Sequence, residues 1–265
     1  MNMTDILKYS VEDRVARLTL NRPESRNALS PELASRIIES VRAADADPGV
    51  KCILIQGEGE HFSAGGDVNN FGGELELTPA QRFDLFERRL LVGNRLPKCL
   101  VDATKPVVAA TRGAVAGGGM ALCLAADFVV CGESSYFIAA HVHLGLSVDC
   151  GLSGLLVAAM GIKAAKRLAL LGERVDAIQA LALGMVTQIV PDDQLDAEVA
   201  SLTQRLASGP ATAMRATKAL LNQAAYPDFD AQLAQEAAHI AECAATDDFR
   251  LGGQAVLARQ RAQFA

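Results

Sequence analysis

The hydrophobic and polar positions along this chain follow two different periods. Residues 14–20 alternate with a period of two, which is typical of a strand, and this run ends at Asn21-Arg22-Pro23. Short, mostly apolar runs predict further strands at 51–56, 107–111, 128–131, 136–139 and 186–190. Helical patterns separate most of these runs, and such alternation predicts an α/β fold with a mostly parallel sheet.

The helical patterns begin after recognisable start signals. Ser30 is a candidate N-cap before Pro31, and an apolar face follows at Leu33, Ile37, Ile38 and Val41. Another helix is expected to begin at Gly118. A longer pattern covers about 78–103, and its predicted buried side consists of Phe83, Leu85, Phe86, Leu90 and Leu91.

The chain divides at about residue 208. We expect residues 1–207 to form an α/β core and residues 208–265 to form a C-terminal region of three helices. These helices carry more apolar positions than a free tail would, at Leu220, Leu221, Leu233, Ala237, Ile240, Ala241 and Cys243. Such positions predict packing against the core or against a neighbouring subunit.

Composition narrows the class of protein. A chain of 265 residues, half of them hydrophobic, can bury a sizeable core. The net charge of -6 argues against nucleic acid as a partner, and the apolar runs are too short to span a membrane. Six cysteines without metal-ligand spacing indicate reduced thiols, and the first five residues lack the pattern of a signal peptide. We therefore expect a cytoplasmic protein with no metal site.

Two glycine-rich segments carry the clearest chemical signal. The first is His61-Phe62-Ser63-Ala64-Gly65-Gly66-Asp67, which follows a predicted strand. The second, at 112–122, has Gly117-Gly118-Gly119 at its centre, follows another strand and opens a helix. Glycines in this setting let backbone N–H groups point at a ligand. Two converging sets would form an oxyanion hole, whereas the alternative is that each loop serves only turns and close packing.

With their neighbouring motifs, these loops resemble the crotonase superfamily, which is the enoyl-CoA hydratase/isomerase family. The resemblance covers nearly the whole chain, from Asn21-Arg22-Pro23 and Asn27-Ala28-Leu29 through 170–173 and 180–186 to the closing helices. It implies a spiral of ββα units with a C-terminal helical region that mediates a homotrimer, or a homohexamer of two trimers. It also implies an acyl-CoA thioester substrate, with coenzyme A as part of that substrate and no separate cofactor.

The resemblance also implies roles for residues of the two loops. Gly66 and Gly118 would donate their N–H groups to the thioester oxygen. Ala28 and Ala64 would lie along the bound coenzyme A.

Three further residues are candidates for the same ligand. Arg26 and Arg261 would meet the phosphates of coenzyme A, although each could equally be a solvated surface charge. Phe264 falls where many relatives place an aromatic ring beside a neighbouring subunit's adenine, with a frayed terminus as the alternative.

The chain departs from the hydratases of this family at both catalytic glutamates, because Ala121 and His141 occupy their positions. Hydration by the usual route is therefore disfavoured. The stretch Leu144-Gly145-Leu146-Ser147-Val148-Asp149 resembles instead a subgroup of ring-epoxide and enoyl-CoA isomerases in which this aspartate is the single acid/base.

We therefore expect an enoyl-CoA isomerase in which Asp149 moves a proton along the acyl chain. The alternative for Asp149 is an N-cap of the helix that begins near Leu152. His141 is a candidate second acid/base, because histidine titrates near neutral pH, or else an inert replacement. Two other functions stay open, a hydratase that uses His141 and Asp149 and a protein that binds acyl-CoA without catalysis.

Overall fold

Two sheets form the frame of the computed structural model, which describes residues 6–67 and 71–264. The larger sheet consists, in spatial order, of β1 (Leu7–Glu12), β2 (Val15–Leu20), β3 (Cys52–Gly57), β4 (Val107–Thr111), β6 (Phe128–Gly132) and β9 (Gln188–Val190). The smaller sheet consists, in spatial order, of β5 (Ala114–Ala116), β7 (Tyr136–Ile138) and β8 (Arg174–Asp176). Beyond the antiparallel pair β1–β2, the larger sheet is parallel, which confirms the predicted α/β class. The first five residues, used above in the argument on signal peptides, lie outside the described part.

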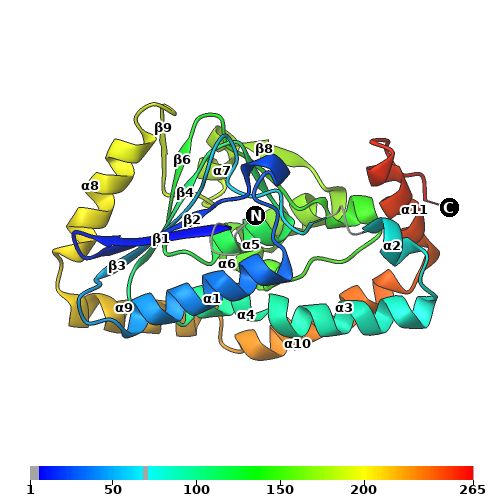
Figure 1. Ribbon diagram of the computed structural model, residues 1–265, viewed down its shortest axis with the longest axis horizontal. Coiled ribbons are helices and arrows are strands. Elements are labelled where there is room, and N and C mark those ends of the chain that lie inside the picture. The colour runs from blue at the N-terminus through cyan, green and yellow to red at the C-terminus, as the bar shows by residue number, and fades with distance from the viewer. Residues whose placement is uncertain (1–5, 68–70, 265) are drawn as a thin grey trace.

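Helices cover both faces of the larger sheet (Figure 1). The core helices are α1 (Pro31–Ala46), α2 (Phe71–Leu75), α3 (Pro79–Gly93), α4 (Arg95–Val101), α5 (Gly117–Leu124), α6 (Leu152–Leu171), α7 (Ala177–Ala182) and α8 (Leu195–Ala207). The 3-10 helices η1 (Pro23–Ser25) and η3 (Ala140–Leu144) join them, and α9 (Ala211–Ala225), α10 (Phe229–Ala244) and α11 (Asp247–Leu257) follow. The predicted N-cap of α1 is observed, since the Ser30 hydroxyl accepts from the Leu33 N–H at 3.2 Å.

The alternation of side chains along each strand explains the two layers of helices. In β3, Cys52 and Leu54 pack with α8 on one face, whereas Ile53 and Ile55 pack with α1 on the other. Successive side chains of a strand point to opposite faces, so a strand buried on both sides has apolar residues throughout. The continuous run at 51–56 is therefore a central strand.

Each turn of the chain visits the larger sheet, then a second layer, and then a helix. After β2, Leu29 bridges Gly66 in the second layer; after β3, Ser63 bridges Val115 of β5; β4 continues into β5, and β6 into β7. This stacking of successive turns is the spiral of ββα units expected from the family resemblance. It places loops that are far apart in sequence directly against one another.

The helical pattern over 78–103 forms two helices, α3 and α4, which meet at Asn94. Phe86 and Leu90 are buried as predicted. Leu91 is 65% exposed, so its assignment to the buried side is wrong. The face of α3 that carries Phe86 and Leu90 packs against α10, and the neighbouring position at 91 turns away from that contact.

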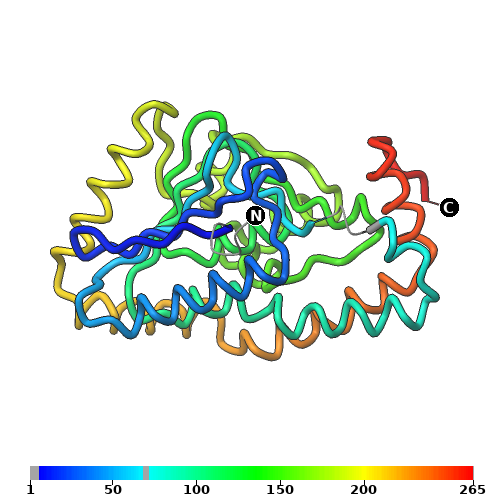
Figure 2. Tube along the Cα trace, in the orientation of Figure 1, coloured from blue at the N-terminus to red at the C-terminus, as the bar shows by residue number. Residues whose placement is uncertain are grey.

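The C-terminal helices α10 and α11 pack on the core of their own chain. α10 runs alongside α3, and α11 lies against α2 and η3 (Figures 1 and 2). The buried guanidinium of Arg82 in α3 donates to the backbone oxygen of Ala244 at 2.7 Å and thereby ties the two helices together. Burial of Leu233, Ala237 and Ile240 confirms the expected packing against the core.

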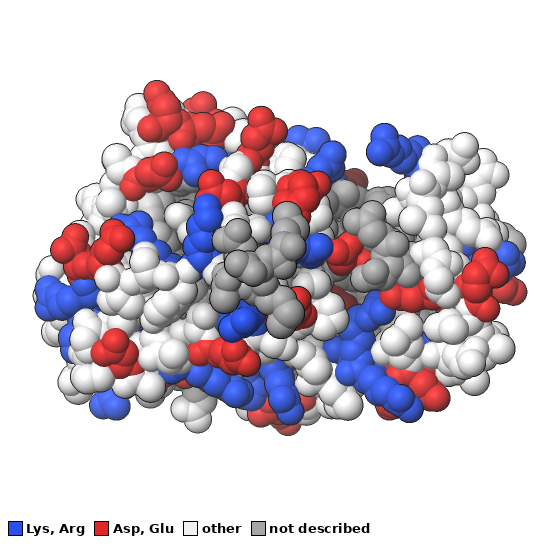
Figure 3. Space-filling model, in the orientation of Figure 1, with Lys and Arg blue, Asp and Glu red and all other residues white. Residues whose placement is uncertain are grey.

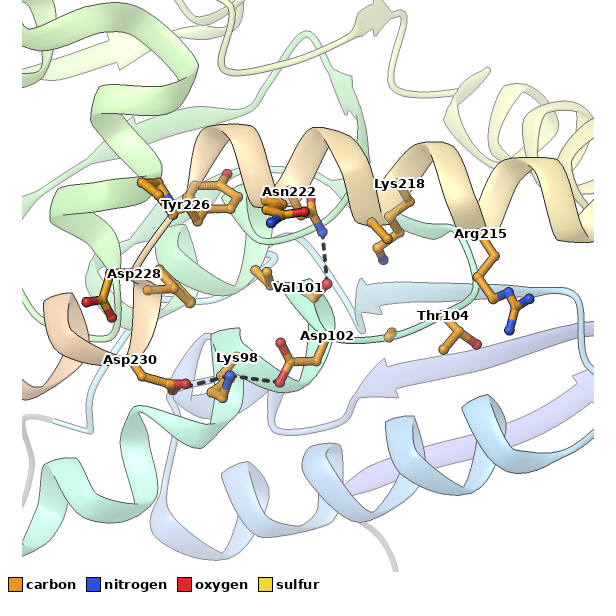
Figure 4. Close-up of a pocket in the computed structure, with 15 residues that line it drawn as sticks. Lys98, Val101, Asp102, Thr104, Arg215, Lys218, Asn222, Tyr226, Asp228 and Asp230 are labelled. Carbon is orange, nitrogen blue, oxygen red and sulfur yellow. Dashed lines mark hydrogen bonds and ion pairs between the residues drawn. The ribbon is translucent and has the colours of Figure 1, made fainter.

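Helix α9 is attached differently, through polar groups. Lys218 donates to the carboxylate of Asp127 at 2.8 Å, and Asn222 donates to the backbone oxygen of Val101 at 2.9 Å. Beside these contacts, α4 and α9 line a hollow of about 390 Å³ (Figure 4). Leu220 and Leu221 face outward, 68% and 64% exposed.

The described surface carries charges of both signs. On the face that Figure 3 shows, acidic and basic side chains are interspersed rather than gathered into a single basic field. No helix among residues 6–67 and 71–264 is long and apolar enough to cross a membrane.

Candidate active site

The two glycine loops touch where consecutive turns of the spiral stack. A Cβ placed on Gly65 would lie 2.6 Å from the backbone oxygen of Ala116 and 3.3 Å from the Cα of Gly117. Gly65 and Gly117 have φ of +84° and +49°, a region that favours glycine. Both the left-handed backbone and the close approach therefore require glycine at the point where the loops meet.

Each loop leaves one backbone N–H group available next to that contact. The Leu29 N–H donates to the Gly65 oxygen at 2.7 Å, and a trans peptide directs the following N–H, that of Gly66, the opposite way. Gly118 lies in the first turn of α5, where helical N–H groups lack intrahelical partners, and the N-cap Ala116 supplies no side-chain acceptor. Within the described residues, neither N–H has a protein acceptor.

The opening motif of the chain supports the first loop. The Arg22 guanidinium donates to the Ala28 oxygen at 2.6 Å and to Asp67 Oδ2 at 3.0 Å. The Ala64 N–H donates to the Arg26 oxygen at 2.9 Å. Three of the residues expected along coenzyme A, Arg26, Ala28 and Ala64, thus belong to one local structure.

The remaining two candidates for coenzyme A lie elsewhere in the chain. Arg261 and Phe264 follow α11, are exposed, and have no recorded contact with the glycine loops among the described residues. A single chain therefore does not bring all five candidates together.

His141 and Asp149 form a pair beside the second glycine loop. His141 Nε2 and Asp149 Oδ1 are 3.1 Å apart, and the side chains are 9% and 18% exposed. The imidazole lies next to Gly117, because a Cβ on that glycine would be 3.9 Å from His141 Nε2. His141 Nδ1 is buried and has no partner among the described residues.

The Asp149 side chain does not cap the following helix. The N-cap of α6 is Gly151, and the Glu236 carboxylate of α10 accepts from the Gly151 N–H at 2.5 Å and from the Ser153 N–H at 2.9 Å. Glu236 therefore occupies the position that the cap alternative gave to Asp149. The Asp149 carboxylate is left facing His141.

Burial affects the titratable groups beside Asp149. It raises the pKa of the Cys150 thiol well above its ordinary value, and the negative charge of Asp149 adds to this, so the thiol stays protonated at neutral pH. Burial likewise raises the pKa of Glu236, against the lowering effect of its hydrogen bonds from Ser153 and Gly151, and the Asp149 charge raises it further.

Two other histidines, His143 and His61, make structural contacts. His143 Nε2 is 2.9 Å from the Gly172 oxygen, and His61 Nδ1 accepts from the Ala114 N–H at 3.2 Å. Ala121, which the resemblance described above places at one hydratase glutamate, is completely buried in α5. No carboxylate can act from that position.

Comparisons with known proteins show the family of this chain. The family model for enoyl-CoA hydratase/isomerase matches residues 10–265. The chain belongs to the enoyl-CoA hydratase/isomerase family. It is 34% identical to 1,2-epoxyphenylacetyl-CoA isomerase of Escherichia coli over 99% of each chain. It is 33% identical to trans-2-decenoyl-acyl-carrier-protein isomerase of Streptococcus mutans, covering 100% of this chain and 99% of the relative.

Solved structures of the enoyl-CoA hydratase/isomerase family show the same fold. An enoyl-CoA hydratase from Mycobacterium avium subsp. paratuberculosis superposes with a TM-score of 0.88 at 34% identity, covering 98% of both chains. The relatives include hydratases as well as isomerases, since 2,3-dehydroadipyl-CoA hydratase of Escherichia coli is 32% identical over 97% of this chain. The chain is therefore an enzyme of this family, and the geometry of its own site has to distinguish isomerisation from hydration.

Sequence reasoning missed Glu236. Its only sequence signal is a carboxylate inside the apolar pattern of α10, between Leu233 and Ile240. A charged residue on the buried face of a helix requires a partner, and this requirement is the signal that could have identified Glu236.

Proposed function

We propose that this chain isomerises enoyl-CoA thioesters by moving a double bond from the β,γ to the α,β position. The supporting observation is the Asp149 carboxylate, which pairs with His141 beside two glycine loops that each leave an N–H group without an acceptor among the described residues. One carboxylate is chemically sufficient for this reaction, because the group that removes the α proton can also deliver a proton to the γ carbon, and the proton it holds can exchange with solvent in between.

In the proposed mechanism, Gly66 and Gly118 hold the thioester oxygen. Asp149 takes the proton from the α carbon, and the electrons of that C–H bond form a dienolate whose negative charge lies on this oxygen. Backbone donors aimed at such an oxygen stabilise it, and the positive end of the α5 dipole adds to the effect. Asp149 then gives the proton to the γ carbon, which yields the conjugated enoyl thioester and restores the carboxylate.

His141 orients Asp149 in this proposal. The tautomer with its proton on Nε2 donates to Asp149 Oδ1, and the other nitrogen, Nδ1, is buried. A buried Nδ1 is out of reach of a substrate carbon, whereas the Asp149 side chain is 18% exposed. The carboxylate is therefore the group that carries the proton, and His141 contributes by fixing its direction.

The same contacts disfavour hydration. Water addition needs one group to activate the water and another to deliver a proton to carbon. Ala121 supplies a methyl group at one hydratase position, and His141 at the other is engaged with Asp149. Binding without catalysis is disfavoured because a protein that only binds acyl-CoA would not require a His–Asp pair beside the glycine loops.

We also propose that coenzyme A binds along Arg26, Ala28 and Ala64, with Arg261 and Phe264 contributed by a neighbouring subunit. The assembly is a trimer or a dimer of trimers. Its support is the exposed apolar surface of α9, where Leu220 and Leu221 have no cover within the chain. Light scattering at micromolar concentration tests the assembly, and a monomer contradicts it.

The decisive experiment incubates the enzyme with saturated, α,β- and β,γ-unsaturated acyl-CoA esters in deuterated water. Double-bond migration with deuterium at the α or γ carbon supports isomerisation. A 3-hydroxyacyl product supports hydration, and tight binding without exchange supports a binding protein.

Asp149→Asn is the matched variant for that experiment. The amide has nearly the size of the carboxylate but accepts no proton at neutral pH, so migration and exchange should be lost while coenzyme A affinity is retained. Equal exchange rates in the wild type and Asp149→Asn would remove Asp149 as the proton carrier.

A further inference from the structure

The start of helix α6 is held by a residue from a distant part of the chain. Glu236 of α10 is 4% exposed, and its carboxylate accepts from the Gly151 N–H at 2.5 Å and the Ser153 N–H at 2.9 Å. The Ser153 hydroxyl also donates to Glu236, and Gln232, one turn earlier on α10, donates to that hydroxyl at 2.6 Å. Three donors thus converge on one buried carboxylate.

These donors lie immediately after Asp149. Gly151 has φ of +77°, and a Cβ there would meet the Phe229 ring at 2.6 Å, so the turn between Asp149 and α6 has little freedom. A helix start leaves N–H groups that need acceptors, and an aspartate just before it is a natural acceptor. With Glu236 in place, those N–H groups are satisfied without Asp149.

We propose that Glu236 is a positioning residue for Asp149, since it takes the N–H groups at the start of α6 and so leaves the Asp149 carboxylate directed at His141. This inference rests on the proposed function only for its effect on rate. The placement of Asp149 is a separate structural claim. Removal of Glu236 should let Asp149 turn toward the vacant N–H groups of Gly151 and Ser153.

The first test is kinetic. Glu236→Gln presents an amide with only one acceptor oxygen to three donors, so it should lower kcat for double-bond migration about 10- to 100-fold, the scale expected for a catalytic group displaced by about 1 Å. KM should change less than about threefold, because the residues proposed to hold coenzyme A lie elsewhere. Ser153→Ala removes one of the three donors and should give a smaller loss of kcat in the same direction.

The matched control is Asn94→Ala. Asn94 donates to the backbone oxygen of Leu233 at 2.9 Å, so it holds the same helix one turn away, and its side chain has no hydrogen bond to α6 among the described residues. Its loss should lower the melting temperature and leave kcat within about twofold of the wild type. If Asn94→Ala lowers kcat as much as Glu236→Gln at equal loss of stability, Glu236 only anchors α10 and the proposal fails.

A second readout follows the His141 imidazole directly. The chain has four histidines, so selective ¹⁵N labelling gives four pairs of imidazole nitrogen signals, and His141→Gln identifies the pair of interest. In Glu236→Gln the chemical shift of His141 Nε2 should move away from the value of an imidazole that is hydrogen-bonded to a carboxylate. Unchanged His141 signals in folded Glu236→Gln or Ser153→Ala overturn the proposal, whatever the rates.

The two readouts separate this proposal from the proposed function. A changed His141 signal with an unchanged rate supports Glu236 as the residue that positions Asp149, and it removes Asp149 as the proton carrier. A changed signal with a lower kcat supports both.

Discussion

Gly65 and Gly66 are adjacent glycines for which the structure predicts opposite responses to alanine. A Cβ on Gly65 would lie 2.6 Å from the backbone oxygen of Ala116, at φ +84°, whereas a Cβ on Gly66 would meet no atom of the described residues within 4 Å, and its φ lies outside the left-handed region. Gly65 therefore serves the contact between the loops, whereas the side-chain position of Gly66 borders space that no described residue fills.

The magnitudes follow from these contacts. Gly65→Ala should destabilise the protein by about 1–2 kcal/mol for the left-handed backbone and by a further 1–3 kcal/mol or so for the overpacking against Ala116. At roughly 2–4 °C per kcal/mol for a chain near this size, the melting temperature should fall by about 10 °C. Gly66→Ala should leave it unchanged or slightly higher, because alanine restricts the unfolded chain.

The effect on activity should be the reverse of the effect on stability, with the specific loss expected in Gly66→Ala. The methyl group of Gly66→Ala would occupy the space in which the thioester oxygen must approach the N–H group, so kcat/KM should fall by about 100-fold, the scale of losing one oxyanion donor. Thermal unfolding at one fixed protein concentration and steady-state kinetics measure both quantities. A Gly66→Ala protein that is as unstable as Gly65→Ala, or fully active, would refute the argument that its N–H group is open to the substrate.

Three further predictions follow from contacts outside the glycine loops. Lys218→Met should destabilise the protein by about 3 kcal/mol, because it strands the buried Asp127 carboxylate. Burial already raises the pKa of Asp127 against the effect of Lys218, so the folded state binds more protons than the unfolded state and stability falls as pH rises above the ordinary range of a carboxyl. Denaturant titrations should therefore show that Lys218→Met loses less stability relative to the wild type near pH 4 than at pH 7. Leu220→Glu should shift the assembly to smaller species in light scattering without unfolding the chain, because this side chain is 68% exposed within one subunit. Burial raises the pKa of Cys52 and Cys131 to about 12, so neither thiol should react with a disulfide reagent at pH 8 until the protein unfolds, and rapid labelling of the folded protein would contradict their burial.

Strands that carry an apolar run could be predicted from the sequence, whereas exposed strands and the short strand β5 inside a glycine-rich segment could not. β2, β3, β4, β6, β7 and β9 lie in the apolar runs that predict strands. β1 has no buried residue, so no hydrophobic pattern predicts it as a strand. Its antiparallel backbone pairing with β2 holds it in the sheet. β8, with charged Arg174 and Asp176 at its ends, is held by its register with β7.

The chemistry of the site was predictable as residues but not as contacts. Motifs within a few residues mark Gly66, Gly118, His141 and Asp149 as candidates. Their arrangement depends on the stacking of successive turns, where Gly65 meets Ala116, and on the turn that returns Asp149 to His141. Sequence spacing alone carries neither fact, because both are set by the packing of separate elements.

The case of Asp149 shows why local rules fail at such a position. From the sequence, where the start of the helix is uncertain by a few residues, an aspartate shortly before it is a candidate cap, and no competing acceptor lies nearby in the sequence. The competing acceptor is Glu236, 85 residues away from Gly151 in the chain. A carboxylate free to face His141 is therefore a consequence of how α10 docks on α6, not of the loop that contains it. The C-terminal region, whose apolar positions suggested only packing and assembly, also completes the surroundings of the candidate proton carrier. A truncation before α10 should accordingly disturb the site even where the glycine loops still fold.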